Sequence, residues 1–296
     1  MDLKQVEYIV AIANEQNITR AAQKLFVTQS ALTQQLLKLE RELQTQLFYR
    51  SRNNWHLTPA GEIYIKNARE LLRIKQDTYR MIADITQTQH GSMSIGFTPG
   101  RGVVMFANVY PAFHKRFPDI TVNPIENLVK KQQQMISDGD LDIGFISLRD
   151  EQKIPGNRYI KLCSEEFFLV VPVSSSLPEK LNEPVDIRLF SEEPFVLISK
   201  DSTMRPIVDG LFKKAGFTPN VLFETSHNPT ILTMVQHGLC CGIVSHYYLR
   251  SPIPNICAYR IYNMPDWGNY ACYRANAYLS EPAKAFIQLA KDYWIG

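Results

Sequence analysis

Hydrogen-bonding and basic side chains are concentrated in residues 19–52, which read TRAAQKLFVTQSALTQQLLKLERELQTQLFYRSR. Amide and hydroxyl groups can hydrogen-bond to base edges, and lysine and arginine can neutralise phosphates. The polar face of a helix is usually only solvated, but this face is rich in short-chain hydroxyl and amide groups. The segment therefore favours contact with DNA. The side chains on that face are Ser30, Thr33, Gln34, Lys38 and Arg41, with Gln29 at its leading end.

Small polar side chains recur in the last two-thirds of the chain, where predicted strands end. Ligands of α/β proteins bind beside the carboxyl ends of parallel strands and the N-termini of helices. Each residue alone is more often a cap or turn residue, but their like positions indicate one pocket for a polar metabolite or small anion. Arg101 either pairs with a carboxylate or phosphate or points to solvent. The candidate ligand-binding residues are Thr98, Arg101, Asn127, Ser147, Ser199, Ser202, Thr203, Ser226 and His227.

The elements around the polar helix form a predicted helix-turn-helix. Apolar spacing predicts a first helix over about residues 2–15 and a second over residues 19–25, capped by Asn17 or Thr19. We expect Phe26 and Val27 to pack the turn. The third helix begins after Thr28, which can cap it. Its inward stripe is Leu32, Leu36, Leu39 and Leu43.

Two short strands follow, over residues 47–50 and 55–57, with residues 51–54 as the connecting wing. Arginines on a wing can reach phosphates or the minor groove. A helix-turn-helix followed by a basic wing is a more specific signal than either part alone.

The pattern T-R-A-A-Q-K-L…T-Q-S-A-L-T-Q-Q-L…L-E-R-E-L…L-F-Y-R…L-T-P-A-G resembles the LysR-type transcriptional regulators. Length and domain order agree over the whole chain, while the specific motif is confined to residues 1–61. Gln34 stands where many members have arginine, and Leu37 takes an outward position that is often basic; both differences affect the target sequence. The resemblance implies base reading by Gln29, Ser30, Thr33 and Gln34, and DNA-backbone contacts by Thr28, Lys38, Arg50 and Arg52.

The resemblance also implies a function and partners. Such a chain is a sequence-specific transcriptional regulator, not an enzyme, that binds an interrupted palindrome in double-stranded DNA. A small-molecule effector controls it, and it contacts RNA polymerase as a homodimer or homotetramer. It needs no cofactor beyond the effector and acts in the cytoplasm. The alternative for the effector domain is a structural or oligomerisation role with no physiological ligand.

A long helix is predicted from Pro59 to about residue 88. Ile65, Leu72 and Tyr79 repeat at seven residues, which is typical of a seam between two paired helices. Lys75 interrupts this seam. The alternative is a long helix that lies on its own domain, but the family resemblance favours a linker that pairs two subunits.

Strands and helices alternate in the remaining chain, which predicts an α/β domain with a mostly parallel sheet. The resemblance implies two lobes similar to type 2 periplasmic binding proteins. The expected domains are an all-α winged helix-turn-helix (1–58), a linker helix (59–89) and an effector domain (90–296), with lobe I at 92–161 and 268–296 and lobe II at 162–267. Strands are expected over residues 92–97, 120–126, 141–147, 167–172, 195–199, 221–225, 240–245, 256–261 and 270–274, and helices over 103–116, 129–137, 205–215, 229–237 and 282–293.

Composition and motifs bound the other function classes. The net charge is +3, and the N-terminal third carries all of this excess. The five cysteines form no C-x-x-C pair and are expected to be buried and reduced. No nucleotide-binding, hydrolase or zinc-protease motif is present. A solute-binding protein lacks a winged helix, and a purely architectural DNA protein has no use for a large α/β cleft. No signal peptide or membrane span is expected.

Overall fold

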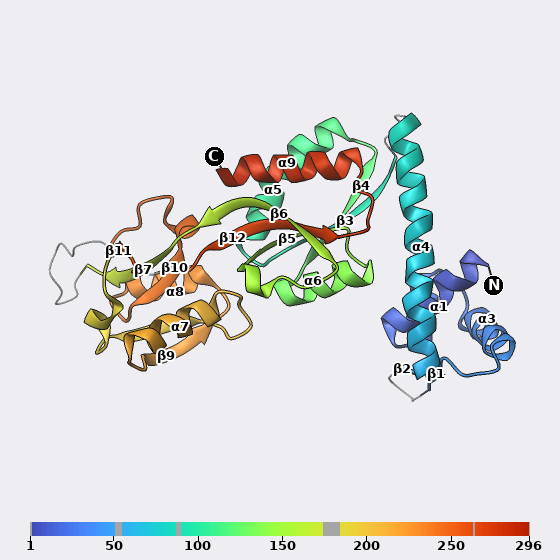
Figure 1. The fold of residues 1–296 in the computed structure, drawn as a ribbon, viewed down its shortest axis with the longest axis horizontal. Helices are drawn as coiled ribbons and strands as arrows, with labels where there is room; N and C mark the ends of the chain where they lie inside the picture. The colour runs from blue at the N-terminus through green and yellow to red at the C-terminus, as the bar shows by residue number, and fades with distance from the viewer. Residues whose placement is uncertain (1, 51–54, 87–89, 174–183, 263, 296) are drawn as a thin grey trace. The chain divides into compact units, whose positions relative to one another are not determined.

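The computed structural model describes residues 2–50, 55–86, 90–173, 184–262 and 264–295. Its contacts divide the chain into two compact units, residues 1–89 and residues 90–296. The first unit is helical apart from one short hairpin, whereas the second is α/β (Figure 1).

Three short helices, α1 (Leu3–Glu15), α2 (Ile18–Lys24) and α3 (Gln29–Glu42), enclose the core of the first unit. Asn17 caps α2 by accepting from the N–H groups of Thr19 and Arg20 at 2.9 and 3.0 Å. Thr28 caps α3 by accepting from the Ala31 N–H at 3.2 Å. These caps satisfy N–H groups that a helix cannot pair internally, which fixes where each helix begins.

The turn between α2 and α3 departs from the sequence prediction. Phe26 was expected to pack this turn, but its side chain is 96% exposed. Leu43 was expected in the inward stripe of α3, yet it is 41% exposed because it follows the helix as its C-cap residue. The rest of the stripe is confirmed, since Leu32, Leu36 and Leu39 are buried.

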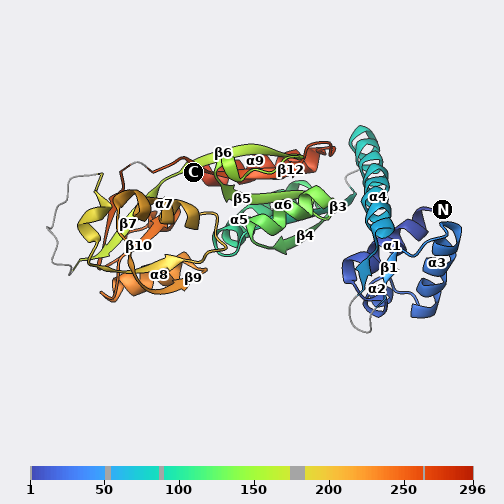
Figure 2. The same ribbon diagram turned by 60° about the horizontal axis from the view of Figure 1, so that its bottom comes forward.

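The wing hairpin consists of β1 (Phe48–Tyr49) and β2 (His56–Leu57), paired antiparallel. Residues 51–54, which include the predicted DNA contact Arg52, lie outside the described residues. Helix α4 (Pro59–Thr86) follows the hairpin, and Figure 2 shows α1 beside its first half.

The predicted seam of α4 is wrong in its first half. Ile65 is buried in the core of the helix-turn-helix unit, and Leu72 packs against the same core. Lys75 does not merely interrupt a seam, because its Nζ pairs with Oε1 of Glu7 on α1 at 2.8 Å. Packing against α1 occupies this side of α4. A different side is exposed and apolar, and it includes Ile63, Leu71, Ile74, Met81, Ile82 and Ile85.

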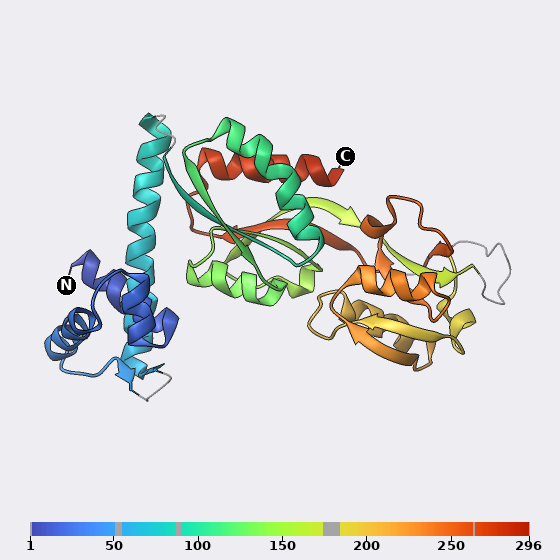
Figure 3. The same ribbon diagram turned by 180° about the vertical axis from the view of Figure 1, so that it is seen from behind.

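Lobe I of the second unit contains a five-stranded sheet in the order β4-β3-β5-β12-β6. Helices α5 (Arg101–Arg116) and α9 (Glu281–Ile295) cover one face and α6 (Val129–Asp138) the other, as Figure 3 shows. A short 3-10 helix, η1 (Asp150–Gln152), follows β5. The strands are β3 (Gly91–Phe97), β4 (Ile120–Glu126), β5 (Ile143–Leu148), β6 (Asn157–Glu165) and β12 (Trp267–Arg274).

Lobe II joins two small sheets, β10-β7-β11 and β8-β9. A parallel bridge between Phe195 and Cys241 links them into one layer. The strands are β7 (Phe167–Pro172), β8 (Pro194–Ile198), β9 (Asn220–Thr225), β10 (Gly242–Ser245) and β11 (Ile256–Arg260), and the helices are α7 (Arg205–Ala215), α8 (Asn228–Gln236), η2 (Ile187–Phe190) and η3 (His246–Leu249).

The prediction of a mostly parallel sheet is wrong. In lobe I, β3 pairs parallel with β4 and β5, but β12 pairs antiparallel with β5 and β6. In lobe II, β7 pairs antiparallel with both β10 and β11. The chain crosses between the lobes twice, from β6 to β7 and from β11 to β12. Antiparallel strands at these crossings let each lobe keep its own parallel βαβ core.

Candidate nucleic-acid interface and ligand cleft

The outward face of α3 carries the predicted base-reading side chains. Gln29, Ser30 and Gln34 are exposed, and Thr33 is half-buried. The Thr19 hydroxyl on α2 donates to Oε1 of Gln29 at 3.1 Å, which leaves the Gln29 amide N–H groups to donate elsewhere. The Thr33 hydroxyl donates to the Gln29 carbonyl at 2.8 Å, so its methyl group is the part suited to an apolar base contact.

The residues predicted to contact the DNA backbone differ in their surroundings. Lys38 is exposed on α3. The Thr28 hydroxyl lies 3.1 Å from that of Ser30 while it also caps α3. Arg50 forms an ion pair with Glu40, whose carboxylate also accepts from the Leu47 N–H at 2.9 Å. Arg50 therefore ties the wing to α3.

A cavity of 610 Å³, here called the cleft, lies between the two lobes of the second unit. Asn127 is the exception among the predicted ligand-binding residues. Its side chain donates to the sulfur of Met135 at 3.6 Å, and it does not line the cleft. The structure brings the others together around the cleft, namely Thr98, Arg101, Ser147, Ser199, Ser202, Thr203, Ser226 and His227.

The cleft lies at the strand ends where α/β proteins bind ligands. Thr98 follows β3, Ser147 lies next to the last residue of β5, and Ser199 follows β8. The first residues of α5, α6 and α8 line it, as does the N-cap residue of α7. The unpaired N–H groups at helix N-termini favour an anionic or polar guest.

Arg101 does not point to solvent. Its side chain is buried, and the guanidinium forms an ion pair with Glu165. It also donates to the Ser147 hydroxyl at 2.5 Å. The guanidinium stacks over the indole of Trp267 at 4.6 Å from the ring centroid. The carboxylate that Arg101 pairs with is therefore internal, and its charge is neutralised without a ligand.

Glu165 is the centre of this buried network. Its carboxylate also accepts from the Asn269 amide at 3.1 Å and from the Tyr247 backbone N–H at 3.2 Å. Burial alone would raise the pKa of Glu165, but the Arg101 charge and the hydrogen bonds hold that pKa below its ordinary value. The network ties strands of lobe I to η3 of lobe II.

Two further contacts bridge the lobes. The Thr203 hydroxyl donates to the Ser147 carbonyl at 2.7 Å, and the Gln152 amide donates to the Thr203 carbonyl at 3.1 Å. Thr203 thus joins the lobes as well as lining the cleft.

Sequence reasoning missed Ser245 and Tyr248, which also line the cleft. Ser245 ends β10 as Ser147 nearly ends β5, so the strand-end rule that selected Ser147 would have selected it. No local signal marks Glu165, because its role depends on Arg101, 64 residues earlier in the chain.

Comparison with known families identifies the chain. Residues 3–62 match the family described as bacterial regulatory helix-turn-helix protein, lysR family, and residues 86–294 match the LysR substrate binding domain. The chain belongs to the LysR family. This LysR-type protein is a DNA-binding transcriptional regulator and not an enzyme, and its second unit is the effector-binding domain.

Relatives match over nearly the whole chain. The uncharacterized HTH-type transcriptional regulator YcgK of Bacillus subtilis is 29% identical, over 99% of this chain and 94% of that protein. A full-length OxyR variant from Pseudomonas aeruginosa is 25% identical with a TM-score of 0.75, over 99% and 94% of the two chains. CbnR complexed with its target DNA is 23% identical with a TM-score of 0.53, over 99% of each chain, and supports the fold.

Two buried thiols of this LysR-type regulator, Cys241 and Cys272, are not activated. All five cysteines are free. Burial raises the pKa of Cys241 to about 12 and that of Cys272 to about 12, so both are protonated at neutral pH. A protonated buried thiol is a poor nucleophile. Among the described residues no cluster of His, Cys, Asp and Glu could hold a metal ion, and no described helix could cross a membrane.

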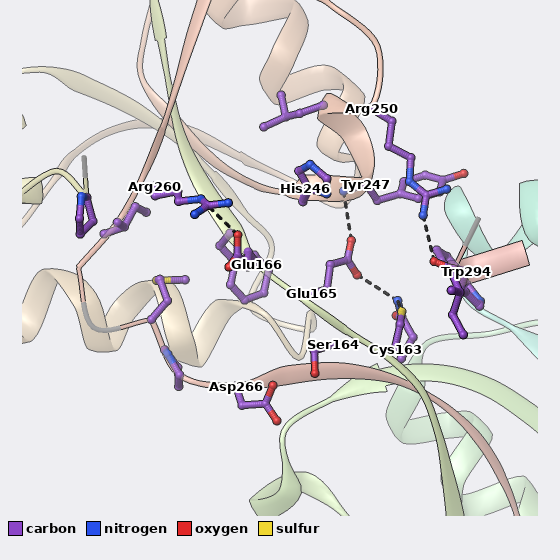
Figure 4. A pocket seen from close by; sticks show the side chains of 18 residues that line it. Cys163, Ser164, Glu165, Glu166, His246, Tyr247, Arg250, Arg260, Asp266 and Trp294 are labelled. Atoms are coloured by element: carbon purple, nitrogen blue, oxygen red, sulfur yellow. Dashed lines mark hydrogen bonds and ion pairs between the residues drawn. The ribbon is translucent and has the colours of Figure 1, made fainter. Parts of the chain in front are cut away.

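A second cavity of the effector domain, here called the hinge cavity, has a volume of 1220 Å³. Figure 4 shows Cys163, Glu165 and Trp294 at its wall, with the pair Glu166–Arg260 (3.4 Å) at another side. The Arg250 guanidinium donates to the Trp294 carbonyl at 3.1 Å. Glu165 lines this cavity while its partner Arg101 lines the cleft.

Proposed function

We propose that this LysR-family regulator reads an interrupted palindrome with two copies of α3, under the control of a small polar or anionic effector that binds in the cleft. One observation carries the proposal: eight polar side chains that the sequence predicts at strand ends or just before helices line a single cavity. A volume of 610 Å³ lies within the ordinary range for small-molecule sites.

The chemistry of the cleft favours a compact ligand with hydroxyl and carboxylate groups. Hydroxyls of Thr98, Ser199 and Ser202 can donate to it, and helix N-termini supply further N–H donors. Arg101 is already neutralised by Glu165, and Asp201 adds a negative charge to the lining. A ligand with one negative charge suits this lining better than one with several.

For the DNA contacts, we assign Gln29, Ser30, Thr33 and Gln34 to the bases and Thr28, Lys38, Arg50 and Arg52 to the backbone. Exposure of Gln29, Ser30, Gln34 and Lys38 on one helix supports this assignment. Glutamine bonds adenine in the major groove, whereas lysine neutralises phosphate without reading sequence.

Members of the family function as oligomers, and the exposed apolar stripe of α4 supports a homodimer through this helix. Leu71, Ile74, Met81 and Ile85 recur at spacings of three, seven and four residues, which keeps them on one side of a helix. Two such dimers can form a tetramer. We further assign RNA polymerase as a partner and the cytoplasm as the site of action.

An electrophoretic mobility shift on the DNA upstream of the chain's own gene tests the proposal, with and without candidate effectors. Thermal shift first screens small carboxylates, amino acids, aromatic acids and phosphates. Thr98→Trp should abolish the effector response and leave effector-free DNA affinity within about twofold, because Thr98 lines the cleft. A specific DNA complex that no cleft ligand alters, with no thermal shift, would favour the structural role for the effector domain.

A further inference from the structure

Phe26, in the turn before α3, is an aromatic residue that the fold neither buries nor favours. Its side chain is 96% exposed, and its φ is 54°. Left-handed backbone is unfavourable for a residue with a Cβ, and asparagine or glycine suits it better. Gln16, Gln44 and Asn255 share this conformation among the described residues, but they are polar.

The turn itself imposes this conformation. The Phe26 N–H donates to the Gln23 carbonyl at 3.2 Å, and the Val27 N–H donates to the Ala22 carbonyl at 3.0 Å. These bonds close the end of α2 and direct the chain into α3. A folding role therefore explains the backbone at this position, but it does not explain a phenylalanine side chain.

The position of Phe26 indicates what its ring contacts. Thr28, the N-cap residue of α3, is two residues away, so their Cα atoms lie within about 7 Å. Gln29 and Ser30 follow, both exposed at the leading end of α3. When the leading end of α3 enters the major groove, Phe26 lies close to that end, and its ring is free to contact the DNA.

We infer that Phe26 is a specificity-determining residue whose ring packs against the 5-methyl group of a thymine at the edge of each half-site. This inference rests on the proposed placement of α3 in the major groove. Phenylalanine cannot hydrogen-bond to a base, and the thymine methyl is the apolar group that the major groove presents. Contact with DNA would bury the exposed ring and offset the backbone cost of the turn.

The test compares Phe26→Asn with Gln44→Asn in the full-length protein. Both substitutions place asparagine in left-handed backbone, but Gln44 lies beyond the other end of α3. The probe is the DNA segment upstream of the chain's own gene that the protein protects in a footprinting experiment. It is synthesised once with thymine and once with uracil. Phe26→Asn should weaken binding to thymine DNA about four- to fifteenfold, since one or two buried methyl-sized groups are lost. Gln44→Asn should not weaken it.

On uracil DNA, Phe26→Asn and the unsubstituted protein should bind within about twofold, because the methyl group is already missing. Amide hydrogen exchange of α2 and α3 should be equal or slower in Phe26→Asn, which excludes unfolding as the cause of weaker binding. Unchanged affinity for thymine DNA, or an equal loss on both DNAs, would overturn the inference. Gln34→Ala provides a separate check, because its failure to alter binding would count against the placement of α3 itself.

Discussion

Arg101 and Glu165 form a buried ion pair whose two members line different cavities, Arg101 the cleft and Glu165 the hinge cavity. Each side chain is 7% exposed. The Glu165 carboxylate also accepts from the backbone of Tyr247 in lobe II, whereas Arg101 belongs to lobe I. The pair therefore lies between the two cavities and contributes to the junction of the lobes.

Glu165→Gln should destabilise the effector domain by about 3–5 kcal/mol, because it leaves the Arg101 charge buried without its partner. Urea unfolding monitored by tryptophan fluorescence checks this, because the guanidinium of Arg101 lies over both Trp267 and Trp294. The control is Glu166→Gln, which removes an exposed partner of Arg260 and should cost less than about 1 kcal/mol. Equal losses in the two variants would contradict a buried, uncompensated charge.

The same ion pair predicts that the protein loses stability at acidic pH. The pKa of Glu165 in the folded protein lies below its ordinary value of 4.5. The unfolded chain therefore binds the proton more tightly, so the stabilisation is complete above this value and is lost as the pH falls through the folded-state pKa. Melting temperatures between about pH 7 and pH 3 should fall less steeply for Glu165→Gln than for the unsubstituted protein. If the melting temperatures of the two proteins fall in parallel with pH, this carboxylate is excluded as a source of the loss of stability in acid.

DNA recognition separates into two measurable parts on α3. Gln34→Ala should relax the choice of one base pair, with a cost of about 1–3 kcal/mol on the best site. Lys38→Ala should weaken all sites alike and reduce the salt slope by about one, because one phosphate contact is lost. Fluorescence anisotropy on a set of single-base operator variants at several salt concentrations measures both. The assigned roles are wrong if Lys38→Ala alters base preference while Gln34→Ala alters only the salt slope.

The sequence predicted features that depend on local rules. The hydroxyl of Thr28 marks the start of α3, and the spacing of its leucines marks its buried face. Both signals involve only residues that are close in the sequence. Thr98 and Ser147 could be placed near one another because the carboxyl ends of the parallel neighbours β3 and β5 lie at the same edge of one sheet. The family motif then supplied the functional reading of these elements.

Features that depend on distant partners could not be predicted. Arg101 needed Glu165 and Trp267, which other strands bring to it. Strand β6 (Asn157–Glu165) was missed because charged and polar side chains break its apolar alternation. Phe26 was expected to pack the turn only because it is hydrophobic. A sequence pattern cannot distinguish an apolar side chain that packs within the chain from one that stays exposed.

Helix α4 gives the last prediction, because Ile65 is buried in the core of its own unit and the proposed dimer contact is instead the exposed apolar stripe that includes Ile74. Ile74 is 51% exposed on the apolar stripe, so Ile74→Glu should place a charge at the proposed dimer contact. Burying an unpaired carboxylate is unfavourable, and the dissociation constant of the dimer should therefore increase at least roughly tenfold. Gln76→Glu adds the same charge at an exposed position off the stripe and should have little effect. Sedimentation velocity over a range of concentrations distinguishes the two variants, and an unchanged dimer in Ile74→Glu would exclude this stripe as the contact.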